Sequence, residues 1–310
     1  MRLGWLVVVA ACGGHAAPSV APVVPVVPAP QPAPVDPHAK FAARARADAA
    51  LHGDVVLDYA RPFTYAPLDR TPTAKLFAEA CADGDNHACI VEAELRPLDA
   101  AGAAYQTVAA HCLGGDAMSC RALPTDDAAA RFPSAPGATS RTAACQHHKP
   151  ECDLEALRRE CAAGFPAACG ELETDEANDR WVQLSVDGCM HGIASECENV
   201  SQLPTSEHDR FELAQRLCDL RPDECTPLAF VYEARHDKAA ARDAWERECE
   251  LGTPRWGVCI QLAERYKTGA LDEPVPGRGQ ALLDWACPKV KANLGEAALA
   301  HFTACTSAKP

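Results

Sequence analysis

The spacing of the cysteines constrains the fold of this chain more than any other feature of its sequence. The chain has 17 cysteines in 310 residues, and from Cys81 onward they follow one another as eight couples. In seven couples the partners stand only seven to ten positions apart, and the couples recur mostly at intervals of about 30 residues. Such a period is typical of repeat architectures. The couples are Cys81 with Cys89, Cys112 with Cys120, Cys145 with Cys152, Cys161 with Cys169, Cys189 with Cys197, Cys218 with Cys225, Cys249 with Cys259 and Cys287 with Cys305.

The residues before each first cysteine predict an amphipathic helix. Tyr105, Val108 and Cys112 fall at positions i, i+3 and i+7, and the same apolar spacing precedes Cys189 and Cys218. This spacing places the side chains on one face of a helix. Alanine is abundant and aromatic residues make up only 6% of the chain, which also favours closely packed helices.

The predicted helices have recognisable starts and ends. Thr71 followed by Pro72 is typical of an N-cap with proline at the first helical position, and Ser206 is a second candidate cap. Three residues after a first cysteine there is often a glycine, the residue that a left-handed helix end favours. The second cysteine then opens the next helix. The glycines are Gly84, Gly115, Gly164, Gly192 and Gly252.

Geometry favours disulfides within the couples. Two cysteines eight positions apart on one straight helix would be about 12 Å apart, which is too far for a disulfide. A glycine turn between them lets the chain double back, so each couple is expected to join the two helices of one hairpin. Cys152 and Cys161 lie on one helix-like segment and should not pair. The prediction is therefore an all-α fold, an α/α solenoid of disulfide-linked helical hairpins.

Zinc binding is the alternative use of clustered cysteines. Structural zinc sites usually begin with two ligands that are two to four residues apart, and the chain contains no C-x-x-C. The missing C-x-x-C also argues against a thioredoxin-like redox site. We therefore expect no metal and no cofactor.

The N-terminus predicts export. A short apolar run after Arg2 ends in Val9-Ala10-Ala11-Cys12, which resembles the lipobox of bacterial lipoprotein signal peptides. The resemblance implies cleavage before Cys12 and lipidation of that cysteine, with Gly13 behind it favouring the outer membrane. Ordinary secretion with cleavage near Ala17 is the alternative. Without Cys12, sixteen cysteines remain, an even number that fits disulfides in an oxidising compartment.

The expected organisation has four parts. Residues 1–11 form the signal peptide, and residues 12–37 form a lipidated, proline-rich tether in extended polyproline geometry. Residues 38–70 begin with a predicted helix that caps the repeat, and residues 71–310 form the cysteine-rich array. The proline-rich segment 121–142 is expected to interrupt the solenoid, and Cys287 and Cys305 to close a terminal helix.

The formal net charge of −14 excludes some partners. Nucleic acid and anionic lipid would both be repelled by an acidic chain. The membrane is therefore expected to be contacted only through the lipid on Cys12. An acidic surface is otherwise most simply a feature that keeps a protein soluble.

The array resembles the cysteine-rich Sel-one-like repeats, TPR-like repeats typified by the bacterial Hcp proteins. The segment CIQLAERYKTGALDEPVPGRGQALLDWAC, residues 259–287, carries the resemblance best, while other units keep mainly cysteine and glycine. The resemblance implies a superhelix that binds proteins or peptides, here in the cell envelope. It also brings an alternative, because some Hcp-like proteins are described as binding or hydrolysing penicillins. The matching positions are Cys259, Leu262, Tyr266, Gly269, Ala281 and Cys287.

Sequence motifs for catalysis are missing. No S-x-x-K, H-E-x-x-H or G-x-S-x-G occurs, and the adjacent His147-His148 is most simply an exposed polar pair. We therefore expect an interaction scaffold rather than an enzyme, with no catalytic residue, and a purely structural envelope lipoprotein as a further alternative. Four tryptophans are expected to pack in the core, although Trp256 could be exposed for binding. They are Trp181, Trp245, Trp256 and Trp285.

Overall fold

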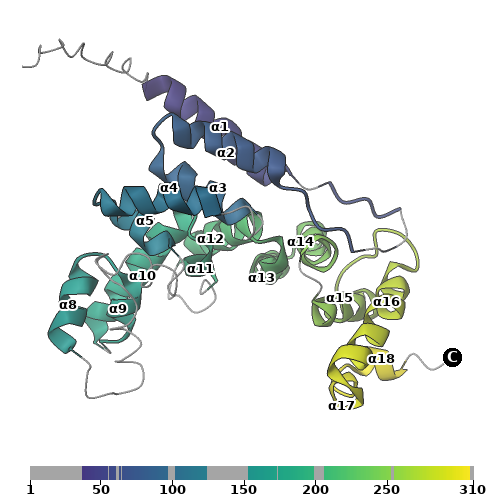
Figure 1. Cartoon of the computed structure of the whole chain (residues 1–310). Helices are drawn as coiled ribbons and strands as arrows, with labels where there is room; N and C mark the ends of the chain where they lie inside the picture. Colours follow the sequence, from purple (N-terminus) through teal and green to yellow (C-terminus); the bar gives the residue numbers. More distant parts are fainter. Residues whose placement is uncertain are drawn as a thin grey trace, which may run out of the picture. The chain divides into compact units, whose positions relative to one another are not determined.

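The fold is all-α and solenoid-like, with consecutive helices packed against one another (Figure 1). The computed structural model describes residues 37–54, 56–60, 63, 65–96, 102–123, 153–172, 174–198, 206–252 and 255–307, and none of these residues lies in a strand. The helices are α1 (Pro37–Gly53), α2 (Thr71–Ala82), α3 (Asn86–Leu95), α4 (Gly102–Leu113), α5 (Ala117–Ala122), α8 (Leu154–Ala162), α9 (Pro166–Gly170), α10 (Asp175–Met190), α11 (Ala194–Cys197), α12 (Glu207–Leu220), the 3-10 turn η2 (Pro222–Glu224), α13 (Thr226–Ala234), α14 (Lys238–Leu251), α15 (Trp256–Thr268), α16 (Arg278–Leu294), α17 (Glu296–Leu299) and α18 (Thr303–Ser307).

The first four described hairpins carry their disulfides at the same place. In α2 and α3, Cys81 is the next-to-last residue of the first helix and Cys89 is the fourth residue of the second. Their Cα atoms lie 4.8 Å apart, within the range that a disulfide needs. The hairpins α4/α5, α8/α9 and α10/α11 repeat this arrangement. The bond therefore joins two helices one turn away from the loop between them.

The second hairpin shows how such a bond also connects neighbouring parts of the core. Cys112 of α4 is bonded to Cys120 of α5, as predicted, and their Cα atoms lie 4.6 Å apart. Cys112 is buried, whereas Cys120 is half-buried and packs both against the core of α3–α5 and against that of α8–α10. Cys120 is therefore a point of contact between two hydrophobic clusters as well as a disulfide partner.

The described disulfides join the couples that the sequence pairs. Cys161 of α8 is bonded to Cys169 of α9, so it is not linked to Cys152, as expected. The predicted couple of Cys145 with Cys152, together with His147-His148, lies outside the described residues, as do Cys12 and residues 124–152. The bonded couples are Cys81 with Cys89, Cys112 with Cys120, Cys161 with Cys169, Cys189 with Cys197, Cys218 with Cys225, Cys249 with Cys259 and Cys287 with Cys305.

Four of the five predicted glycine turns have the expected left-handed geometry. Gly84 has φ +89°, and the next amide, of Asp85, donates to the carbonyl of Ala80 at 3.1 Å. This six-to-one bond is the Schellman motif, which satisfies a carbonyl at the helix end. The same backbone bond follows Gly115, Gly164 and Gly192.

Gly252 does not have the predicted left-handed conformation. It leaves α14 with φ −80° and ψ −172°, which is extended backbone that any residue can adopt. A side chain is excluded there for a different reason: the backbone of Asp223 comes so close that a Cβ built on residue 252 would lie 2.5 Å from its Cα. The turn between Cys249 and Cys259 is longer than the others, so it does not need the tight glycine turn.

Of the two predicted helix N-caps, Ser206 is confirmed and Thr71 is wrong. The side chain of Ser206 accepts the amide of Asp209 and caps α12, as expected. Thr71 is not a cap but lies inside α2, which has Arg70 at its N-cap. The cap function is supplied by Asp69, whose carboxylate accepts the amide of Thr71 at 3.0 Å.

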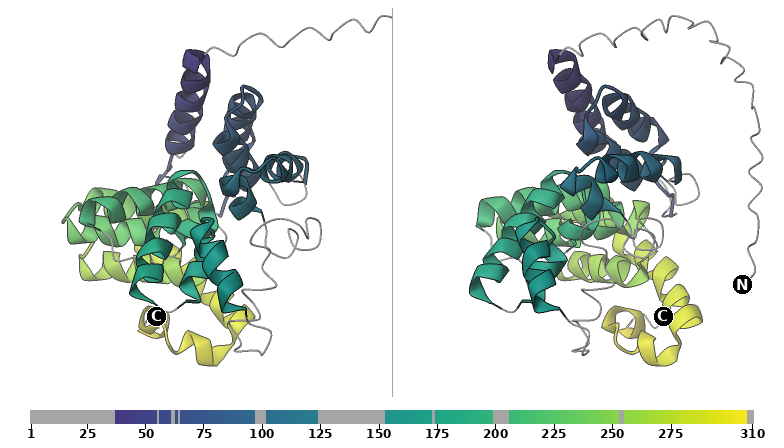
Figure 2. Two further views of the ribbon diagram at one scale, coloured as in Figure 1. Left: turned by 90° about the vertical axis from the view of Figure 1, so that its left-hand side faces the viewer. Right: turned by 60° about the vertical axis from the view of Figure 1, so that its left-hand side comes forward.

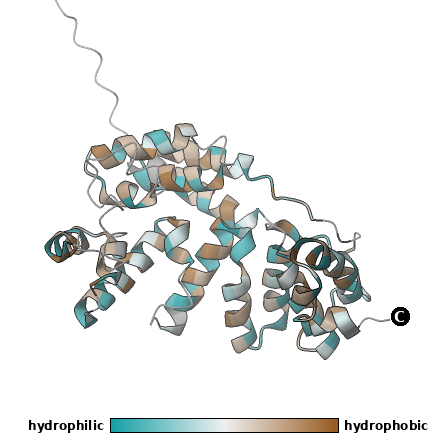
Figure 3. Cartoon of the chain, turned by 60° about the horizontal axis from the view of Figure 1, so that its bottom comes forward, coloured by the Kyte–Doolittle hydropathy of each residue, from teal (hydrophilic) through white to brown (hydrophobic). Residues whose placement is uncertain are grey.

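The main core runs from α1 to the C-terminal helices. Its largest side chain is Trp245 of α14, which is completely buried and donates from Nε1 to Glu233 at 2.8 Å. Around the helices of Figure 3 hydrophobic and hydrophilic residues alternate, as expected for helices that each bury one face. Trp181, Trp256 and Trp285 are half-buried and pack against this core, so Trp256 is not the exposed side chain that the sequence allowed.

The two ends of the described array are closed in different ways, one by a helix and the other by a disulfide. The predicted N-terminal helix is present as α1, which packs on α2 and, more lightly, on α12. At the other end, Cys287 of α16 is bonded to Cys305 of α18. Figure 2 shows the hairpins between these ends following one another in chain order. Among the described helices, none is long and apolar enough to cross a bilayer.

Candidate functional site

An extended segment between α1 and α2 crosses the later repeats. We call the described residues between α1 and α2 (54, 56–60, 63 and 65–70) the strap; they lead away from α1 and back to α2, passing α14 and α16 on the way (Figure 1). The amide of Ala66 donates to the carbonyl of Glu250 at the end of α14, at 3.2 Å. The strap therefore contacts residues nearly 200 positions away in the sequence.

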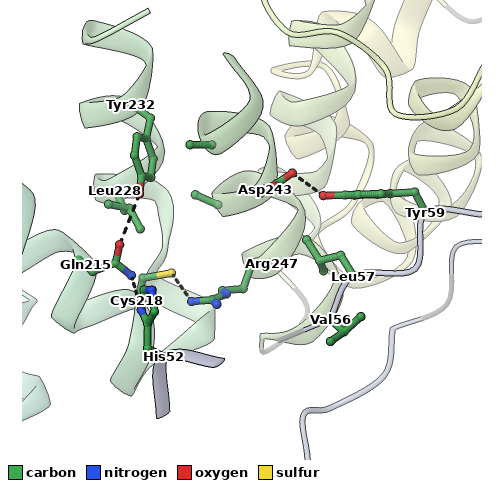
Figure 4. Close-up of a pocket in the computed structure, with 12 residues that line it drawn as sticks. His52, Val56, Leu57, Tyr59, Gln215, Cys218, Leu228, Tyr232, Asp243 and Arg247 are labelled. Carbon is green, nitrogen blue, oxygen red and sulfur yellow. Dashed lines mark hydrogen bonds between the residues drawn. The ribbon is translucent and has the colours of Figure 1, made fainter. Parts of the chain in front are cut away.

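A cavity of about 430 Å³ lies between the strap and three helices (Figure 4). The end of α1 and the strap line one side, and α12, α13 and α14 line the other. Apolar and polar side chains alternate around it. This size is within the range of small-molecule and side-chain pockets in proteins. The lining residues are His52, Val56, Leu57, Tyr59, Gln215, Cys218, Leu228, Tyr232, Ala240, Asp243, Ala244 and Arg247.

Asp219 of α12 organises the polar groups on one side of the cavity. This buried carboxylate accepts from Arg247 Nη1 and from Gln215 Nε2, both at 3.1 Å, and lies 3.1 Å from His52 Nδ1. Gln215 in turn accepts the hydroxyl of Tyr232 at 3.5 Å. The network fixes the orientation of each of these side chains because every one shares a partner with the next.

The other side of the cavity is closed by Tyr59 of the strap. Its hydroxyl donates to Asp243 of α14, and the guanidinium of Arg242 lies 5.1 Å from the centre of its ring. Burial, followed by the hydrogen bond to Asp243, raises the pKa of Tyr59 well above its ordinary value. Tyr59 therefore remains a neutral hydrogen-bond donor at every physiological pH.

A disulfide forms part of the cavity wall. Cys218 is bonded to Cys225, the residue directly before α13, and Arg247 Nη1 lies 3.4 Å from the Cys218 sulfur. The bond fixes α12 against α13 at the place where both helices contribute lining residues.

Two further residues, Phe63 and Arg70, anchor the strap beyond the cavity. Phe63 is buried, and the centre of its ring lies 4.7 Å from that of Trp285 in an edge-to-face arrangement. The guanidinium of Arg278 lies 5.1 Å from the centre of the Phe63 ring. Arg70 donates Nη1 to the carbonyl of Leu220 at 2.6 Å and Nη2 to that of Asp219. A helix C-terminus favours such a cation. Burial lowers the pKa of Arg70 to about 10, so it stays charged at neutral pH.

The chemistry available to the cavity depends on which side chains line it. His52 and Asp219 form an imidazole–carboxylate pair whose nearest atoms lie 3.1 Å apart. Among the residues that line the cavity there is no serine or threonine, and the one cysteine is held in a disulfide. In the described part of the chain, no three metal-ligating side chains gather in one place.

A second hollow lies between α8 and α10. It has a volume of about 960 Å³ and is lined by Leu154, Arg158, Leu172 and Arg180 among others. One of its charged groups, Arg158, pairs with Glu155 of its own helix and not with a residue of α10. Because this hollow has no polar network like that around Asp219 among its described residues, we take the first cavity as the candidate site.

Sequence reasoning located the disulfides but missed the cavity. Its lining residues come from positions 52 to 247 and form no motif, because they meet only through packing of the strap on α12–α14. The one available signal was the alternation of aromatic residues with prolines in residues 56–70, which suits an extended segment better than a helix.

The geometry defines a class of protein: a disulfide-linked helical-repeat protein whose repeat surface holds an extended segment. Its abundant disulfides indicate an oxidising, extracytoplasmic environment. Comparison with protein-family models, with curated proteins and with solved structures finds no match to this chain.

Proposed function

We propose that this chain is a binding module that holds an extended peptide segment of another protein on the surface of α12–α16, with a side chain of that segment in the cavity. One observation carries the proposal. The same surface already holds the strap, an extended segment, through a backbone hydrogen bond, a buried aromatic ring and a captured arginine. Repeat proteins use such continuous surfaces for peptide recognition.

The proposal extends to the cellular setting. We infer a distant relationship to the cysteine-rich Sel-one-like repeats of the Hcp type, supported by the matching frame at residues 259–287 and by the paired helices. The lipobox-like Val9-Ala10-Ala11-Cys12 supports anchoring through a lipid on Cys12 in the bacterial envelope, at the outer membrane. The partner is then an envelope protein.

Peptide selection tests the proposal directly. The oxidised chain is panned against a random peptide library, and the dissociation constants of selected peptides are measured by calorimetry. Ala240 lines the cavity and Ala239 is its exposed neighbour on α14, so the two alanines form a matched pair. Ala240→Trp should weaken binding at least tenfold by filling the cavity, while Ala239→Trp should leave it unchanged.

Two results would contradict the proposal. One is a selection that yields no peptide with saturable binding, and the other is a set of selected peptides that bind Ala240→Trp as tightly as the unmodified chain. A chromogenic β-lactam assay on the same samples addresses the enzymatic alternative. Turnover that Ala240→Trp abolishes would favour a hydrolase over the non-enzymatic scaffold that we propose.

A further inference from the structure

The strap contacts its surface in the manner of a bound ligand. Four residues of the strap hold it there: Tyr59 and the amide of Ala66 at α14, Phe63 at α16 and Arg70 at α12. Phe63 is the central anchor of the strap, because its ring contacts both Trp285 and Arg278. An aromatic side chain in a pocket with polar contacts around it is the usual composition of a peptide anchor.

The strap is nevertheless an imperfect ligand. Of its described residues only Phe63 is buried, and Val56 is 88% exposed. Beside Leu57 and Tyr59 the cavity remains unfilled. A segment with few buried apolar contacts opens at a lower free energy than the core of its protein. A partner that also fills the cavity would bury apolar area that the strap leaves unused.

We propose that the strap is an internal competitor that covers the peptide-binding surface, and that the partner is an extended segment with an aromatic side chain and an arginine about seven residues further on. The inference rests on the proposed function. The spacing is that of Phe63 and Arg70. The arginine is selected by the backbone carbonyls of Asp219 and Leu220 at the end of α12 and by the nearby carboxylates of Asp219 and Asp223.

Covering the surface in this way lowers the apparent affinity for the partner. The observed dissociation constant equals the intrinsic one divided by the fraction of molecules in which the strap is open. A change that weakens the strap without touching the surface should therefore tighten binding of an outside segment. This is the opposite of what loss of a merely structural segment would do.

A labelled peptide with the chain's own sequence from Val56 to Arg70, VLDYARPFTYAPLDR, tests the inference. Fluorescence anisotropy should show weak binding to the unmodified oxidised chain and at least tenfold tighter binding to the Phe63→Ala/Arg70→Ala variant, whose surface is intact. Ala60→Ser is the strap control and should not change the affinity, because Ala60 is exposed and does not line the cavity. A peptide with alanine in place of Phe63 should bind neither protein.

The outcomes separate this inference from the proposed function. Equal affinity for the unmodified chain and the double variant, or no binding to either, would overturn the competitor role even if library peptides still bind. If the double variant does not fold, hydrogen exchange on the unmodified chain replaces it. An excess of the peptide should then accelerate exchange at Ala66, and unchanged protection there with peptide bound would contradict the inference.

Discussion

At the residue scale, several charged side chains lie buried in the core, where their removal from water costs free energy. Arg278 of α16 is 3% exposed and donates to Glu246 at 2.7 and 3.1 Å and to Glu250 at 3.2 Å, both carboxylates being completely buried. The hydroxyl of Tyr266 also donates to Glu246, at 2.8 Å. Arg278 thus connects α16 to α14, and Tyr266 connects α15 to the same Glu246.

Removal of that arginine should be severely destabilising. Arg278→Met removes both hydrogen bonds that the buried carboxylate of Glu246 receives from its arginine, and we expect a loss of about 3–5 kcal/mol in the free energy of unfolding. The measurement is urea denaturation followed by circular dichroism. Arg158→Met is the control, because Arg158 and Glu155 form an exposed pair, and its effect should stay within about 0.5 kcal/mol. Similar losses for the two variants would contradict the prediction.

Glu248 should make stability depend on pH. Its carboxylate is 1% exposed and accepts the amide of Thr226 at the start of α13, yet burial outweighs that bond and raises its pKa to about 7. The folded state therefore holds the proton more tightly than the unfolded state, whose glutamate has a pKa near 4.5. The stability from this group is fully present below about pH 4.5 and is lost as the pH rises through 7.

Glu248→Gln checks this sign. The amide can still accept from Thr226 but carries no charge, so the variant should gain on the unmodified chain by about 2–3 kcal/mol between pH 5 and pH 8.5. Paired urea denaturation curves at the two pH values measure the difference. A difference that is independent of pH would show that Glu248 does not titrate in this range.

At the scale of the element, the hairpin follows from local rules. A glycine ends the first helix, a six-to-one bond closes the turn, and a disulfide joins the helices one turn further in. Each step involves residues within about ten positions of one another, which explains why the pattern is legible in the sequence. Gly252 shows the limit, because the same position in the pattern is glycine for a tertiary reason.

The two kinds of glycine should respond differently to alanine. At Gly84 a Cβ would meet nothing within 4 Å, so Gly84→Ala costs only the left-handed conformation, about 1–2 kcal/mol. At Gly252 the conformation costs nothing, but the Cβ would collide with the backbone of Asp223, and we expect about 1–3 kcal/mol from overpacking.

Asparagine, which tolerates the left-handed region, separates the causes. It should recover part of the stability at Gly84 and none at Gly252, as measured by thermal unfolding of the four variants. Recovery at Gly252 would assign that glycine to backbone conformation instead of to its contact with Asp223.

At the scale of the whole molecule, short disulfide loops support an array of small hairpins. A loop closed by cysteines eight positions apart contributes about 2–3 kcal/mol in the chain-entropy account, and such contributions do not simply add. Total stabilities of folded proteins are only about 5–15 kcal/mol. We therefore expect that full reduction at neutral pH abolishes the cooperative thermal transition and most of the helical circular dichroism.

Peptide mapping without reduction checks the connectivity on which this depends. It should recover the sequential couples, including Cys145 with Cys152, which lies outside the described residues. A linkage of Cys152 to Cys161, or free thiols throughout the array, would contradict the hairpin arrangement. Retention of the full thermal transition after complete reduction would show that the helices do not need the bonds.

The sequence alone determined the all-α class, the hairpin as the repeating unit and the cysteine couples within the described array. These are local properties, because helix periodicity, glycine turns and short disulfide loops are each set by residues close together in the chain. The left-handed glycine at Gly84 and the cap at Ser206 belong to the same group, as does the bond of Cys112 to Cys120.

Only the tertiary structure decided where the strap lies and what it covers. Phe63 reaches Trp285 and Arg70 reaches the end of α12 because α1, α2 and the later repeats pack into one core. Contacts between residues about 150 to 220 positions apart leave no periodic signal in a single sequence. They depend on the complementary shapes and charges of surfaces that exist only after the helices have packed.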